Sequence, residues 1–76
     1  MMTRYKNLGG NSNVISYEIG IDYIKVQFSS GSPYEYSYRS AGASNVERAK
    51  ILAQNGCGLN SFIMTNMRKL YERKTA

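Results

Sequence analysis

The strongest constraint on the fold is a pair of alternating runs between Tyr23 and Arg39, joined by a turn rich in Ser, Gly and Pro. Apolar or aromatic residues occupy every second position in both runs. They are Ile24, Val26 and Phe28 in the first run and Tyr34, Tyr36 and Tyr38 in the second. A period of two is typical of a strand that is buried on one side. The stretch therefore predicts a β-hairpin that the other elements cover or flank.

The position of the turn decides which way the tyrosines face. If Ser29 to Pro33 form a five-residue loop, Phe28 pairs with Tyr34 and the tyrosines join the apolar face. A tight turn at Ser30-Gly31 would instead make the tyrosines an aromatic, basic platform, and it would place Glu35 on the core face. Because burying an unpaired carboxylate is costly, we expect the first register, in which the tyrosines are structural.

An earlier alternating run, from Asn13 to Gly20, predicts a first strand. A turn at Ile21-Asp22 would place Ile15 beside Phe28 in the core and Glu18 opposite a lysine on the outer face. The open face of the resulting meander would carry two acids and two bases. Such a face suits solvent or a protein partner better than a phosphate backbone.

Two helices are expected after the meander. The spacing from Ser44 to Glu47 is that of a capping box, so a helix should begin at Ser44 and stop at Asn55-Gly56. A last helix should run from about Asn60 to about Arg73. Its apolar stripe would consist of Leu59, Ile63, Met67, Leu70 and Tyr71.

The expected fold class is thus α+β, with a three-stranded antiparallel β-meander followed by two α-helices packed on one face. Residues 13–76 would form a single domain, since a chain of 76 residues is long enough for one core. Residues 1–12 are polar and contain two adjacent glycines, so we expect them to form a flexible N-terminal arm.

Several function classes are disfavoured by composition. Cys57 is the single cysteine and there is no His, which excludes an internal disulfide and a zinc site built from Cys and His. The five carboxylates are scattered and no base accompanies Cys57, so we expect neither an enzyme nor a cofactor. The opening MMTRYKNLGG fits neither a signal peptide nor a membrane anchor, and the expected location is the cytoplasm.

Basic residues outnumber acidic ones by ten to five, which gives a formal net charge of +5. They gather near the C-terminus at Arg68, Lys69, Arg73 and Lys74. This group has a structural explanation, because cations complement the dipole at a helix C-terminus and Arg68 is spaced to pair with Glu72. The functional explanation is a patch that contacts phosphates. Arg4, Lys6 and Tyr5 would be auxiliary contacts, with Tyr5 as a stacking residue.

A central Tyr-x-Tyr and a late Gly…Asn-x-x-Ile make the chain resemble the KTSC domain. The matching residues are Tyr34, Tyr36, Gly56, Asn60 and Ile63. That family comprises short domains found alone in bacteria and phages and at the C-terminus of some lysyl-tRNA synthetases, and RNA binding has been suggested for it. The chain departs from the family pattern at Ser37 to Gly42, where the family commonly has Val-Pro, and at Met64, where the family often has Arg. We expect Asn60 to be the N-cap of the last helix.

Nucleic-acid binding through the basic C-terminal residues is the leading expectation, and the resemblance favours RNA over DNA. The alternative is a protein-interaction module, either a homodimer or a modulator of a partner protein. Such a module would use the open face of the sheet or a strand edge.

Overall fold

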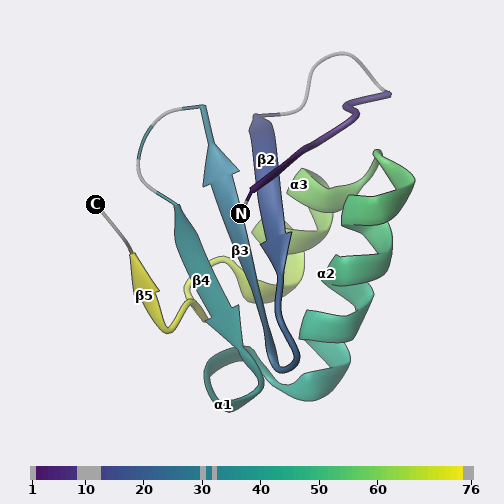
Figure 1. The fold of residues 1–76 in the computed structure, drawn as a ribbon. Helices are drawn as coiled ribbons and strands as arrows, with labels where there is room; N and C mark the ends of the chain where they lie inside the picture. The colour runs from purple at the N-terminus through teal and green to yellow at the C-terminus, as the bar shows by residue number, and fades with distance from the viewer. Residues whose placement is uncertain (1, 9–12, 30, 32, 75–76) are drawn as a thin grey trace.

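Three antiparallel strands form the centre of the fold (Figure 1). They are β2 (Val14–Ile19), β3 (Tyr23–Phe28) and β4 (Tyr34–Ser37). This computed structural model describes residues 2–8, 13–29, 31 and 33–74, with the backbone alone at 73–74. The expected α+β class and the central meander are confirmed.

The sheet has two more strands than expected, one at each edge. The short strand β1 (Thr3–Arg4) pairs with β2, and the short strand β5 (Arg73–Lys74) pairs with β4. The strand order is β1-β2-β3-β4-β5. The segments that contain β1 and β5 therefore fold back onto the meander, at opposite edges of the sheet.

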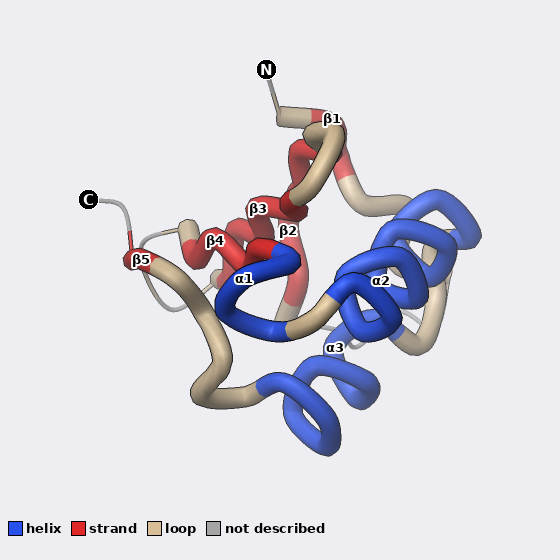
Figure 2. The backbone as a smooth tube through the Cα atoms, turned by 90° about the horizontal axis from the view of Figure 1, so that it is seen from below, coloured by secondary structure: helices blue, strands red, loops and turns tan. Residues whose placement is uncertain are grey.

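The helical segments follow the meander. They are α1 (Tyr38–Ala41), α2 (Ala43–Asn55), α3 (Leu59–Phe62) and the π-helix η1 (Ile63–Met67). Figure 2 shows α2 and α3 on the same side of the sheet. The core lies between this helical layer and the sheet, with Ile24, Val26, Leu59, Ile63 and Met67 fully buried.

Pairing between β2 and β3 follows the expectation except at one end. Ile19 pairs with Ile24, but a bulge between Val14 and Ser16 inserts one extra residue, Ile15. An extra residue reverses the side to which the following positions point. Val14 therefore takes the buried place opposite Phe28, and Ile15, which we expected in the core, is 47% exposed.

Pairing between β3 and β4 is shifted by two residues from the expected register. Val26 pairs with Tyr34, and Ile24 pairs with Tyr36, so the expected pairing of Phe28 with Tyr34 is wrong. A shift of two residues leaves every side chain on its original face. The expectation that Tyr36 joins the apolar face is accordingly confirmed, since only 1% of it is exposed.

Strand β4 ends at Ser37, although we expected it to continue through Tyr38. Ser37 caps α1 instead: its Oγ accepts a hydrogen bond from the backbone N–H of Ser40 at 3.1 Å, and Ser40 Oγ accepts one from the N–H of Ser37 at 3.1 Å. The capping box therefore lies at Ser37 and not at Ser44. Helix α2 follows from Gly42, which occupies its N-cap position without a side-chain bond.

Helix α2 has the expected buried face, which includes Val46, Ala49 and Ala53. It ends at Gly56, whose φ of 84° lies in the left-handed region that glycine adopts most easily. Lys50 is also buried, and its Nζ donates to the carbonyl of Ile21 at 3.0 Å. This bond ties the turn between β2 and β3 to the helix.

The last helix is shorter than expected. Leu59, Ile63 and Met67 are buried as predicted, but the helical segment ends at Met67 and not near Arg73. The chain then crosses to the sheet, where the backbone N–H of Glu72 donates to the carbonyl of Glu35 at 2.6 Å. Leu70 and Tyr71 lie in this crossing, not on a helix, and are 39% and 40% exposed.

The N-terminal segment differs from the flexible arm that we expected. The ring of Tyr5 is buried in the core, its backbone N–H donates to the carbonyl of Ile15 at 2.9 Å, and its hydroxyl accepts the N–H of Leu59 at 3.3 Å. Leu8 N–H donates to the carbonyl of Gly56 at 2.8 Å. The rest of the expected arm, at residues 9–12, lies outside the described residues.

Candidate functional site

A pocket with a volume of about 330 Å³ opens between the sheet and the C-terminal helical segment. It is built from four separate parts of the chain: the strands β3 and β4, the residue before β2, the segment α3–η1, and the crossing to β5. Its lining residues are Asn13, Phe28, Tyr34, Tyr36, Asn60, Met64, Arg68, Lys69 and Tyr71. The pocket therefore depends on tertiary contacts between segments that are far apart in the sequence.

Aromatic rings from the sheet form one wall of the pocket. Phe28 and Tyr34 meet edge to face, with ring centroids 5.7 Å apart and an interplanar angle of 82°. Such pairs favour each other because the positive edge of one ring meets the negative face of the other. Burial raises the pKa of Tyr36 further above its ordinary value of 10.0, at which the hydroxyl is already neutral at physiological pH. The wall is thus aromatic and uncharged.

Tyr71 adds a third tyrosine to the pocket from outside the sheet. Its ring centroid lies 4.8 Å from that of Tyr34 and 6.4 Å from that of Tyr36, and it is nearly perpendicular to both rings. It is 40% exposed, whereas Tyr36 is buried. The sequence placed Tyr71 on a helical stripe, and no local signal indicated that it would meet the tyrosines of the hairpin.

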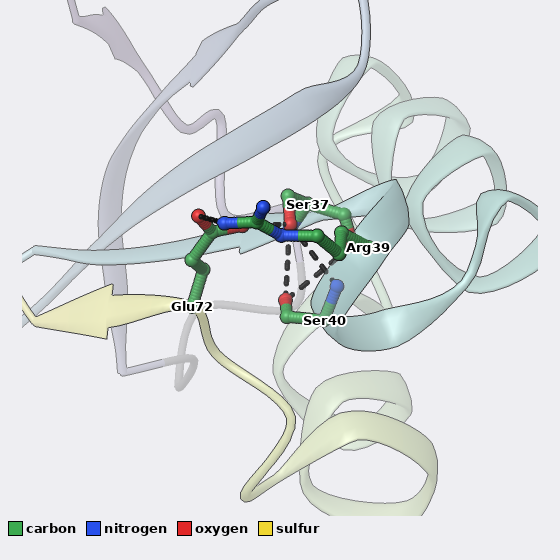
Figure 3. Close-up of polar contacts among 4 residues, drawn as sticks. All are labelled: Ser37, Arg39, Ser40 and Glu72. Atoms are coloured by element: carbon green, nitrogen blue, oxygen red, sulfur yellow. Dashed lines mark hydrogen bonds and ion pairs between the residues drawn. The ribbon is translucent and has the colours of Figure 1, made fainter.

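Glu72 fixes the crossing segment that carries Tyr71 (Figure 3). Its carboxylate accepts a hydrogen bond from Ser37 Oγ and pairs with Arg39, whose guanidinium nitrogen lies 2.9 Å away. The expected partner of Glu72 was Arg68 at the i,i+4 spacing. That pairing is wrong because the helix ends before either residue, so the spacing no longer brings them together.

Two of the expected phosphate-contacting residues lie at this pocket. Arg68 and Lys69 follow the last turn of η1, line the pocket and are exposed. No salt bridge joins either of them to an acid within the part of the chain that the structure describes. The side chains of Arg73 and Lys74 lie outside that part, and their backbones form β5 beside β4.

The expected auxiliary residues do not join the same patch. Arg4 belongs to β1, at the opposite edge of the sheet from β5, and Lys6 packs beside Gly56 at the end of α2. Arg4 and Lys6 instead border a second hollow of about 320 Å³ together with Tyr5. Because the Tyr5 ring is only 3% exposed, the role in stacking expected for it is wrong.

The residues shared with the KTSC pattern take different places. Tyr34, Tyr36 and Asn60 line the pocket, Ile63 is buried in the core, and Gly56 ends α2. Asn60 is not the N-cap that we expected. Gly58, with a φ of 81°, occupies that position, so Asn60 lies within α3 and its side chain reaches the pocket.

The described part of the chain contains one free thiol and no cluster of metal ligands. Cys57 is exposed in the turn between α2 and α3, and no group of three or more potential metal ligands occurs among the described residues. Those residues also include no helix with the length and apolar character needed to cross a bilayer.

The comparisons with known proteins gave no match: no family model, no curated protein and no solved structure is significantly similar to the chain.

Proposed function

We propose that the chain is a non-enzymatic binding module for single-stranded RNA. The observation that carries this proposal is the position of Arg68 and Lys69 at the edge of a pocket lined by tyrosines. Proteins that bind single strands combine cations, which contact the backbone phosphates, with aromatic rings, on which the bases stack. The pocket offers both kinds of group within one small surface.

The charge of the whole chain supports the same proposal. A formal net charge of +5 attracts polyanions over a distance of several ångströms, and this attraction weakens as salt is added. The preference for RNA over DNA rests on the resemblance of the chain to the KTSC domain. Arg73 and Lys74, which follow Glu72, would extend the contact with phosphates along the edge of the sheet.

The open face of the sheet offers less to a polyanion. Tyr23 donates a hydrogen bond to Glu18 at 2.7 Å, and Lys25 lies directly opposite Glu35 in the pairing of β3 with β4. Acidic side chains thus lie beside Lys25 on this face. We therefore place the RNA contact at the pocket and not on the open face.

Fluorescence-anisotropy titrations with single-stranded RNA, duplex RNA and duplex DNA, each at several salt concentrations, test the proposal. For single strands, each phosphate contact contributes about 0.7 to the slope of log K against log salt. Arg68→Ala and Lys69→Ala should each lower the slope by about 0.7. Arg48→Ala is the matched control, because Arg48 is also exposed but lies outside the pocket.

The control variant should keep the slope of the unchanged protein. Equal slopes for Arg68→Ala, Lys69→Ala and Arg48→Ala would place the phosphate contacts elsewhere. A protein that binds none of the three nucleic acids at low salt would refute the proposal altogether. In that case, binding to a protein partner becomes the function to test.

A further inference from the structure

The size of the pocket limits what can enter it. A volume of about 330 Å³ is at the lower end of the range of about 300–1,000 Å³ found for small-molecule sites. A duplex or a folded domain is far larger than this. The ligand must therefore be a small group, or one residue of a longer chain that turns into the pocket.

The wall of the pocket selects a flat, apolar ring system. Phe28, Tyr34 and Tyr71 meet edge to face and form one continuous aromatic wall. Tyr71 and Met64, which also line the pocket, are 40% and 43% exposed. Aromatic rings bind other π-systems by offset or edge-to-face contact. A planar heterocycle meets this demand better than an aliphatic chain, because its own π-system can contact the aromatic wall.

Asn60 adds polar recognition within the aromatic surroundings. Its side-chain amide has two donor hydrogens and an acceptor oxygen, and no described residue hydrogen-bonds this amide. The edges of nucleobases carry neighbouring donors and acceptors of the same kind. An amide that lines an aromatic pocket is therefore suited to the edge of a base.

The positive charge at the rim of the pocket further restricts the class of ligand. Arg68 and Lys69 are exposed cations next to the aromatic wall. A ligand that uses both parts of the site must join a flat ring to a nearby anion. A nucleotide does so, because its phosphate is attached to the sugar that carries its base.

We infer that the pocket receives one unstacked nucleobase against the aromatic wall formed by Tyr34 and Tyr71, with the phosphate of the same nucleotide at Arg68 and Lys69. This inference rests on the proposed function, and it deepens it by naming the unit that is bound. The same chemistry can come from an RNA strand or from a free nucleoside monophosphate. A strand adds further phosphate contacts, so it should bind more tightly than the free nucleotide.

A short RNA with 2-aminopurine at successive positions tests the inference, because the fluorescence of this base responds to stacking. One position should change strongly on binding, and removing that base to leave an abasic nucleotide should weaken binding by about tenfold. The abasic strand retains every phosphate and leaves the protein unchanged. Its effect therefore cannot arise from altered folding or from lost charge contacts.

Variants of Tyr71 give the complementary test. Tyr71→Ala should weaken binding of the intact RNA by about tenfold, yet should have little effect on the abasic strand. Tyr71→Phe should retain binding. Tyr38→Ala is the matched control, because Tyr38 is 38% exposed and lies outside the pocket. Titration with adenosine and uridine monophosphates then tests the free nucleotide as the source.

The outcomes separate the inference from the proposed function. Equal binding of abasic and intact strands, together with weaker binding by Arg68→Ala, would overturn the base pocket and leave the RNA module. Binding of a monophosphate without binding of any strand would keep the pocket and overturn the RNA module. Failure of both kinds of ligand to bind would overturn both.

Discussion

Glu72 pairs with Arg39, a residue 33 positions earlier in the chain, at a distance of 2.9 Å between oxygen and nitrogen. Arg39 is largely exposed, with 85% of its side chain accessible, so this ion pair should contribute about 0–1 kcal/mol. The firmer contacts of Glu72 are those with Ser37 Oγ and with the carbonyl of Glu35. Together they hold the adjacent Tyr71 against the sheet.

Glu72→Ala should release the crossing segment without unfolding the core. We expect faster hydrogen exchange at the backbone amide of residue 72, because the side-chain contacts that hold its bond to Glu35 are lost. The ring of Tyr71 should also lose its contact with Tyr34. Two-dimensional NMR measures both effects. Arg39→Ala should change the exchange rate little, and an equal change in both variants would mean that the ion pair is the main anchor.

A set of glycine substitutions should separate backbone strain from steric clash. Gly56→Ala should destabilise most, since its φ is 84° and its new Cβ would lie 2.7 Å from Lys6 Cβ. Gly42→Ala adds only the strain of a φ of 90°, and Gly31→Ala adds neither. Urea denaturation should therefore rank the losses Gly56 > Gly42 > Gly31, with at least about 1 kcal/mol for Gly56→Ala. A different order would contradict the packing of Lys6 on Gly56.

Ile63→Ala should leave a cavity at the junction of α3 and η1. Ile63 is fully buried, and such truncations cost about 2–5 kcal/mol. Met64→Ala, at the neighbouring 43% exposed position, should cost less than about 0.5 kcal/mol. Denaturant midpoints compare the two variants. Similar losses would mean that the helix is rotated relative to the core.

Acid should weaken the contact between α1 and α2. Hydrogen bonds from Lys50, at 2.7 Å, and from Tyr38, at 2.5 Å, hold the pKa of Glu47 below its ordinary value of 4.5. A lowered folded-state pKa contributes stability above the unfolded value, and this stability is lost as the pH falls through the folded value. The Glu47→Gln variant should therefore be less stable than the unchanged protein at about pH 6, and its stability should fall less than that of the unchanged protein between about pH 5 and pH 3. Denaturation curves across this range measure the difference, and parallel curves for the two proteins would contradict it.

Local patterns were sufficient to assign the buried faces of β3 and α2. The alternation around Val26 and the spacing of Val46, Ala49 and Ala53 each report which side of one element is apolar, and that information lies within a few residues. Pairing partners are less well determined. A shift of two residues between β3 and β4 leaves the apolar pattern unchanged, so the sequence does not distinguish Phe28 from Val26 as the partner of Tyr34.

The end of the last helix was mispredicted for a related reason. Leu70 and Tyr71 continue the helical spacing of Ile63 and Met67. The helix nevertheless ends at Met67, and the chain then pairs with the sheet. The pocket itself combines residues as distant as Tyr34 and Tyr71. Arg68 and Lys69 were identified from charge, but their proximity to an aromatic wall depends on tertiary contacts that no local pattern records.

The edge strands have a consequence for how the protein behaves at high concentration. β1 and β5 contain two residues each, and each carries at least one basic residue. An incoming strand from another molecule would gain few backbone hydrogen bonds at either strand, and it would have to approach positive charge. The sheet is therefore a poor template for polymerisation, and concentrated samples should resist amyloid-like growth.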